Sequence, residues 1–140
     1  MKYKKYLNFY LISLPFLVLL VNQILEYIYG PYVIGVNPIA NIFHFIGGIS
    51  ISLSSAGIIN YSYKKKLILA HSKVIIYGLI IGNVCLAIIS WEIIEYLFVF
   101  PNFPDLLGYE DTIMDMILGL LGGFFGLVLI SFLNYHVIDK

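Results

Sequence analysis

Two apolar segments of the chain carry pairs of acidic residues at spacings typical of one helix face. Glu92 and Glu95 lie three residues apart in SWEIIEYLFVFP, and Asp111 and Asp115 lie four residues apart in EDTIMDM. Residues at i+3 and i+4 are neighbours on a helix surface. Each segment can therefore offer two carboxylates to one site, where they could bind a cation or transfer protons.

A third segment adds an imidazole and an amide. In NPIANIFHF, Asn41 and His44 also stand at i and i+3. Carboxylate, imidazole and amide groups together suit magnesium, manganese, calcium or zinc. Several ionised carboxylates close together repel one another, so we expect a bound divalent cation or a shared proton to neutralise them, and the sequence leaves both open. The candidate metal ligands are Asn41, His44, Glu92, Glu95, Asp111 and Asp115.

These residues lie in or beside four apolar runs, each of about the 20 residues that a membrane-spanning helix needs. The runs are continuous and do not alternate, which favours helices over barrel strands. Of the 140 residues, 61% are hydrophobic and only 11% are charged. The sequence predicts one integral membrane domain over residues 1–140, an all-α polytopic transmembrane bundle with spans at about 7–29, 38–59, 74–100 and 112–133.

Three further features limit the function classes. Lysines precede the first run, but the run is too long for a signal peptide and no small-residue cleavage site follows, so we expect a retained helix that Pro15 could kink. The single cysteine, Cys85, excludes an internal disulfide and a cysteine-based metal cage. The formal net charge of zero gives no reason to expect a nucleic-acid partner.

The basic residues predict the topology. All eight are lysines, and they gather at the two chain ends and between the second and third runs, at positions Lys2, Lys4, Lys5, Lys64, Lys65, Lys66, Lys73 and Lys140. By the positive-inside rule, we expect a multi-pass protein of the cytoplasmic membrane with both termini and the 61–73 loop in the cytoplasm. Of the eight acidic residues, only Asp139 falls on that side. The acidic cluster is then near the extracytoplasmic face.

Asp115 begins a stripe of small residues. Gly119, Gly122 and Gly126 follow it on the same helix face, and such stripes let two membrane helices approach closely. We therefore expect Asp115 to point into the bundle. Because Gln23 and Glu26 lie near the outer end of the first run, we also expect every span to offer polar groups at a similar depth.

The segments WEIIEY, DTIMDM and GLLGG together resemble an uncharacterised family of bacterial and archaeal integral membrane proteins of the YjdF type. The matching positions are Trp91, Glu92, Ile93, Glu95, Asp111, Thr112, Asp115 and Met116, with His44 as the upstream histidine. The resemblance covers roughly residues 37–126, and a looser similarity exists to VanZ-like membrane proteins. It indicates that the polar positions are not accidental, but it leaves their purpose open and supplies no reaction. The chain departs from the pattern in being shorter than many members and in carrying Glu110 before Asp111.

Each of the candidate ligands below also has a structural interpretation that involves no metal. Glu92 and Glu95 could end the third helix among the lipid headgroups, since helix ends are hard to predict. Asp111 could be a helix N-terminal charge favoured by the macrodipole. His44 could be a structural hydrogen-bond partner between helices.

Three functions fit these observations. The preferred hypothesis is a metal-assisted site that acts on or binds a lipid or lipid-linked substrate, with His44, Glu92, Glu95 and Asp115 as catalytic candidates. Its weakness is the lack of any arginine, or of a lysine at the outer face, to hold a phosphate. The alternatives are a transporter or binding protein for protons or divalent cations, and a non-enzymatic membrane interaction module. The expected partners are membrane lipids, a second copy of the chain or another membrane protein.

Overall fold

The protein is an all-α bundle. The computed structural model describes residues 2–29, 38–69, 72–98 and 109–132, and no strand occurs among them. Each helix in this part of the chain is long and apolar enough to cross a membrane. The predicted four-span bundle is confirmed, and the chain is a multi-pass membrane protein. The helices are α1 (Lys2–Tyr29), α2 (Pro38–Lys64), α3 (Lys73–Phe98) and α4 (Tyr109–Phe132).

Several helices extend beyond the predicted spans. α1 begins at Lys2, α2 continues to Lys64, and α4 already begins at Tyr109. Hydropathy marks only the part of a helix that fits the hydrocarbon core, while backbone hydrogen bonding continues into polar residues. Positions 99–100 and 133 of the predicted spans lie outside the described residues.

Local signals set the helix ends. Pro38 is the first residue of α2, where its missing N–H costs nothing. Glu110 and Asp111 lie in the first turn of α4, where negative charge complements the helix dipole. The Ser72 hydroxyl accepts a hydrogen bond of 3.2 Å from the Val74 N–H and so caps the start of α3.

α2 ends in a turn for which the sequence gives no glycine signal. The N–H of Leu67 donates to the Ser62 carbonyl, and the N–H of Lys66 donates to the Tyr63 carbonyl, both at 2.9 Å. Lys66 has a φ of 59°. This is the Schellman arrangement, in which the left-handed position is usually a glycine. Lysine occupies it here, in the predicted lysine loop.

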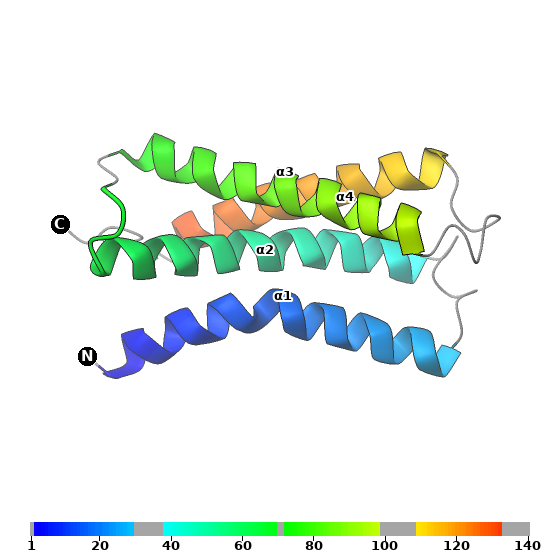
Figure 1. Ribbon diagram of the computed structural model, residues 1–140, viewed down its shortest axis with the longest axis horizontal. Helices are drawn as coiled ribbons and strands as arrows, with labels where there is room; N and C mark the ends of the chain where they lie inside the picture. The colour runs from blue at the N-terminus through cyan, green and yellow to red at the C-terminus, as the bar shows by residue number, and fades with distance from the viewer. Residues whose placement is uncertain (1, 30–37, 70–71, 99–108, 133–140) are drawn as a thin grey trace.

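α2 lies at the centre of the bundle, between α1 on one side and α3 with α4 on the other (Figure 1). Its most extensive contact is with α4. A Cβ atom added at Gly48 of α2 would collide with the backbone of Gly119, and one added at Gly122 would collide with the backbone of Phe45. The predicted role of the glycine stripe, close helix approach, is confirmed.

α1 packs on α2 through small and polar residues. The Asn60 amide donates to the Asn8 side-chain carbonyl at 3.4 Å, and the Ser54 hydroxyl donates to the Ile12 carbonyl at 3.4 Å. Figure 1 shows that α1 bends midway, and Pro15 lies within it. The polar contacts join α1 to α2 in the half of the bundle that contains the described lysines.

The buried apolar core occupies this same half. Its members come from α2, α3 and α4, and they are Ala56, Ile59, Ile76, Ile80 and Ile130. Toward the other end of the helices, glycines of α2 and α4 make close backbone contacts, and Asp115 is buried. The two halves of the bundle are therefore built differently, and the acidic residues of the site belong to the glycine-packed half.

Candidate functional site

Three helices bring one histidine and two carboxylates together. His44 of α2, Glu95 of α3 and Asp115 of α4 each offer one ligand atom, and these atoms lie within 4.8 Å of one another. The Nε2 atom of His44 is 3.3 Å from Oδ2 of Asp115. We call His44, Glu95 and Asp115 the ligand triad. Its members were all among the predicted metal ligands.

Asp115 is the most buried member of the triad, with 5% of its surface exposed. Its position follows from the glycine face of α4, because Gly119 and Gly122 are buried on the same side. While Oδ2 faces His44, Oδ1 is buried with no hydrogen-bond partner among the described residues. An unpaired buried oxygen is costly, most of all at membrane depth. A cation or a proton at this oxygen would remove that cost.

Glu92 lies beside the triad. Its side chain lies beside Thr112 of α4, and it is close enough to Glu95 and Asp111 for their charges to repel. Its Oε1 atom is buried and has no hydrogen-bond partner among the described residues. Glu92 and Asp111 therefore form a second acidic layer next to the triad, and the structure does not place them in the triad itself.

Other predicted positions lie elsewhere. Asn41 is exposed and does not line the cavity beside the triad, although it is one turn from His44. On α1, Gln23 is exposed, and Asn22 lines the cavity instead. The side chain of Glu26 lies outside the described part of the structure.

The interpretation in which the two glutamates lie among the lipid headgroups stays a prediction. α3 continues to Phe98, three residues beyond Glu95. At 1.5 Å per residue, Glu95 is about 5 Å inside the end of its helix. His44 and Asp115 each follow the first residue of their helix by six positions, or about 9 Å. The triad therefore lies within the bundle, close to one end of the helices.

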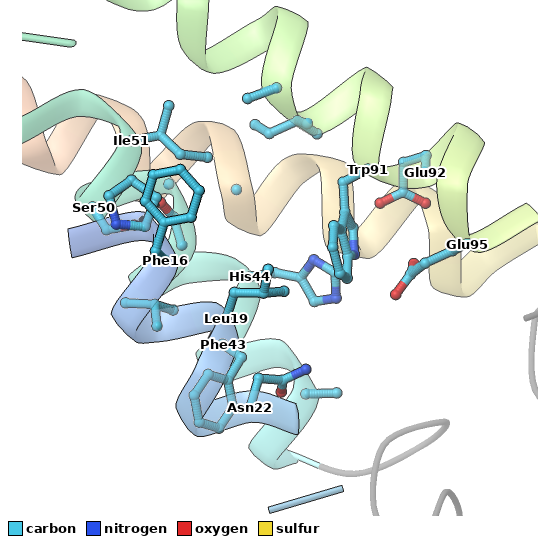
Figure 2. Close-up of a pocket in the computed structure, with 18 residues that line it drawn as sticks. Phe16, Leu19, Asn22, Phe43, His44, Ser50, Ile51, Trp91, Glu92 and Glu95 are labelled. Atoms are coloured by element: carbon cyan, nitrogen blue, oxygen red, sulfur yellow. Dashed lines mark hydrogen bonds between the residues drawn. The ribbon is translucent and has the colours of Figure 1, made fainter. Parts of the chain in front are cut away.

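A cavity of about 300 Å³ adjoins the triad between α1 and α3, with α2 along its side. Figure 2 shows His44, Trp91, Glu92 and Glu95 at one end of this cavity and Phe16, Ser50 and Ile51 at the other. Apart from its polar end, most of the lining side chains are apolar. α1 and α3 make no extensive contact with each other, so the cavity lies where two membrane-facing helices stand apart.

The charges of the bundle are strongly segregated. The described lysines occupy the first turns of α1, the end of α2 with the segment after it, and the first residue of α3, all at the end of the bundle opposite the triad. No lysine is among the described residues that line the cavity, and the chain contains no arginine. The polar end of the cavity therefore combines acidic groups with the imidazole of His44, and no lysine is among its described lining residues.

The triad suits a borderline divalent cation. One imidazole and two carboxylates are a common donor set for zinc and manganese. A site with three protein ligands leaves coordination positions open, as in catalytic metal sites. The same atoms could instead share a proton between His44 and Asp115. Both possibilities use residues that the sequence singled out.

The sequence did not reveal the cavity. Its walls include Phe16 and Leu19 of α1 and Ala87 of α3, which are ordinary residues for a membrane helix. The sequence singled out Trp91 only as part of the WEIIEY motif. No pattern distinguishes an apolar side chain that lines a cavity from one that faces lipid, because both require the same chemistry.

No protein-family model matches the chain, and no match was found among curated proteins or solved structures. The resemblance to YjdF-type and VanZ-like proteins therefore stays a prediction.

Proposed function

We propose that the protein binds a lipid or lipid-linked substrate in the cavity and acts on it at a divalent cation held by the ligand triad. The observation that carries this proposal is the position of His44 and Glu95, which belong to the triad and also line the apolar cavity between α1 and α3. A substrate chain in the cavity would place its polar end beside the cation.

The donor set supports the chemical part of the proposal. A cation with open positions polarises a phosphoryl or carbonyl oxygen or activates water. Glu92 lines the cavity beside Glu95, where it can act as a general base. The cation also compensates for the missing arginine and lysine, since it supplies the positive charge that a developing oxyanion requires.

The cavity supports the substrate part of the proposal. Its volume of about 300 Å³ is at the lower end of the range of small-molecule pockets, about 300–1,000 Å³. It would accommodate one chain or one headgroup and not a whole two-chain lipid. Because its walls belong to helices that face the membrane, the rest of a lipid could stay in the bilayer.

A second candidate is binding of a proton or cation without a reaction. The unpaired Oδ1 atom of Asp115 favours it, since protonation of the carboxyl group would suffice to neutralise this oxygen. Transport across the membrane has less support. Among the described residues on the lysine side of the triad, the core cluster is apolar. The buried polar residues around it are asparagines and serines, which do not titrate.

We also propose that the lysine end of the bundle faces the cytoplasm and that the triad lies near the outer face of the cytoplasmic membrane. The segregation of the described lysines supports this orientation. Cys85 is the only cysteine, so Cys85→Ser gives a clean background for Lys65→Cys and Glu110→Cys. A membrane-impermeant maleimide applied to intact cells should label only position 110, and labelling of position 65 would reverse the orientation.

Bound metal is the direct test of the triad. The protein would be purified in dodecyl maltoside, loaded with zinc, manganese or magnesium, and analysed by elemental mass spectrometry. We expect near-stoichiometric metal in the parent and a large loss in Asp115→Asn and Glu95→Gln, which preserve side-chain volume. The exposed Glu110→Gln is the matched control, because it removes a charge near the same end of the bundle without touching the triad.

The variants must fold for this comparison, which size-exclusion profiles and helical circular dichroism would show. If the folded parent retains none of the three metals, the metal-assisted function is wrong and proton binding becomes the better explanation. If metal binds, lipids extracted from the source membrane would be screened as substrates for conversion that metal removal abolishes.

A further inference from the structure

The polar end of the cavity combines carboxylates with an aromatic face. Glu92, Glu95 and Trp91 line it together, on successive turns of α3 (Figure 2). The Oε1 atom of Glu92 is buried and lacks a hydrogen-bond partner among the described residues. A carboxyl group and an indole thus line the part of the cavity where the headgroup of a bound amphiphile would lie.

The charges at the polar end of the cavity indicate which ligand charge it favours. A divalent cation in the triad balances the charges of Glu95 and Asp115. Glu92 and Asp111 remain as two further acidic groups beside the triad. Since no lysine is among the described residues that line the cavity, the acidic groups at this end favour a ligand with a positive group over an anionic one.

We infer that the cavity selects amphiphiles whose headgroup carries an ammonium group. The ammonium lies against the indole of Trp91 and the carboxylate of Glu92, and the single chain extends between α1 and α3 toward Phe16 and Ile51. Aromatic faces attract ammonium groups, most strongly when water is excluded. This inference rests on the proposed binding of a lipid in the cavity and narrows it to one class of headgroup.

Trp91 provides a built-in probe, because it is the only tryptophan in the chain. The metal-loaded protein in dodecyl maltoside would be titrated with three amphiphiles of equal chain length. These are dodecyltrimethylammonium, the uncharged hexaethylene glycol monododecyl ether, and dodecyl phosphate. The change in Trp91 emission gives an apparent Kd for each.

We expect dodecyltrimethylammonium to bind about tenfold or more tightly than the uncharged amphiphile, and dodecyl phosphate to bind most weakly. In Glu92→Gln, the preference for ammonium over the uncharged amphiphile should fall to about threefold or less. Glu110→Gln is the matched control and should keep the preference of the parent. Trp91→Phe would confirm that the emission change arises at this residue.

The outcomes separate this inference from the proposed function. If the uncharged amphiphile binds as tightly as the ammonium compound, the cavity binds chains but the inference is wrong. If dodecyl phosphate binds best, the inference is also wrong, and the cation itself holds the headgroup. If none of the three binds, lipid binding in the cavity fails, and the inference fails with it. If Glu92→Gln does not fold, the ranking in the parent decides alone.

Discussion

The Nε2 atom of His44 lies 3.3 Å from Oδ2 of Asp115, and one helical turn further along both helices Gly48 meets the backbone of Gly119. Both steps are i to i+4, so the ion-pair geometry and the glycine contact share one register between α2 and α4. The close approach of the backbones is what lets a histidine and an aspartate from different helices meet.

His44 and Asn41 lie one turn apart on α2, and only His44 belongs to the triad, so we expect their substitutions to affect metal binding differently. His44→Gln removes a ligand atom, and we expect the affinity for zinc to fall by at least about tenfold. Asn41→Gln changes an exposed side chain and should leave the affinity unchanged. Competition titrations with a chromophoric chelator would measure both. A loss of affinity in Asn41→Gln equal to that in His44→Gln would return Asn41 to the ligand set.

Two adjacent glycines of α2 should respond to alanine in opposite ways. A Cβ at Gly48 meets backbone atoms of α4, whereas a Cβ at Gly47 has nothing within 4 Å. We expect Gly48→Ala to destabilise the bundle by about 1–3 kcal/mol, because backbone cannot move aside as a side chain can. Gly47→Ala should be neutral or stabilising by up to about 1 kcal/mol, because alanine favours the helix.

Thermal unfolding in dodecyl maltoside, followed by circular dichroism, would compare these two variants with the parent. Gly48→Ala should also weaken metal binding, because the shared register positions His44 against Asp115. Equal stability of the two variants would show that α2 and α4 do not pack as closely as described.

The hydrogen bond between Asn8 and Asn60 should contribute measurably to the attachment of α1. Interhelical side-chain hydrogen bonds in membrane proteins contribute about 0.6 kcal/mol on average and at most about 1.7 kcal/mol. A double-mutant cycle with Asn8→Ala and Asn60→Ala should give a coupling free energy in this range. A coupling free energy near zero would mean that the two amides stabilise the bundle independently.

The turn after α2 offers a stabilising substitution. Lys66 adopts a left-handed conformation, which costs an L-residue about 1–2 kcal/mol, and glycine avoids this cost. Because glycine also gains freedom in the unfolded chain, we expect Lys66→Gly to raise the free energy of unfolding by only about 0.5–1 kcal/mol. Lys65→Gly is the control and should not be stabilising. A lower stability for Lys66→Gly would contradict the described turn.

The acidic spacings and the glycine stripe made much of the site predictable. Asp115 shares a helix face with Gly119, and a polar residue on a glycine face of a membrane helix points at a neighbouring helix. Asn41 shows the limit of this reasoning. It shares a face with His44, yet it is exposed, because spacing fixes a direction around the helix axis and not what stands opposite.

The sequence by itself determined the helices, because the length and polarity of an apolar run must match the membrane, and a chain in lipid must satisfy its backbone groups within each helix. It also determined which polar groups were too costly to be incidental. Only the tertiary structure decided that His44, Glu95 and Asp115 form the triad, that Glu92 and Asp111 stand beside it, and that α1 and α3 leave a cavity between them. These depend on the register and separation of helices far apart in the chain, which side-chain packing sets and local periodicity does not encode.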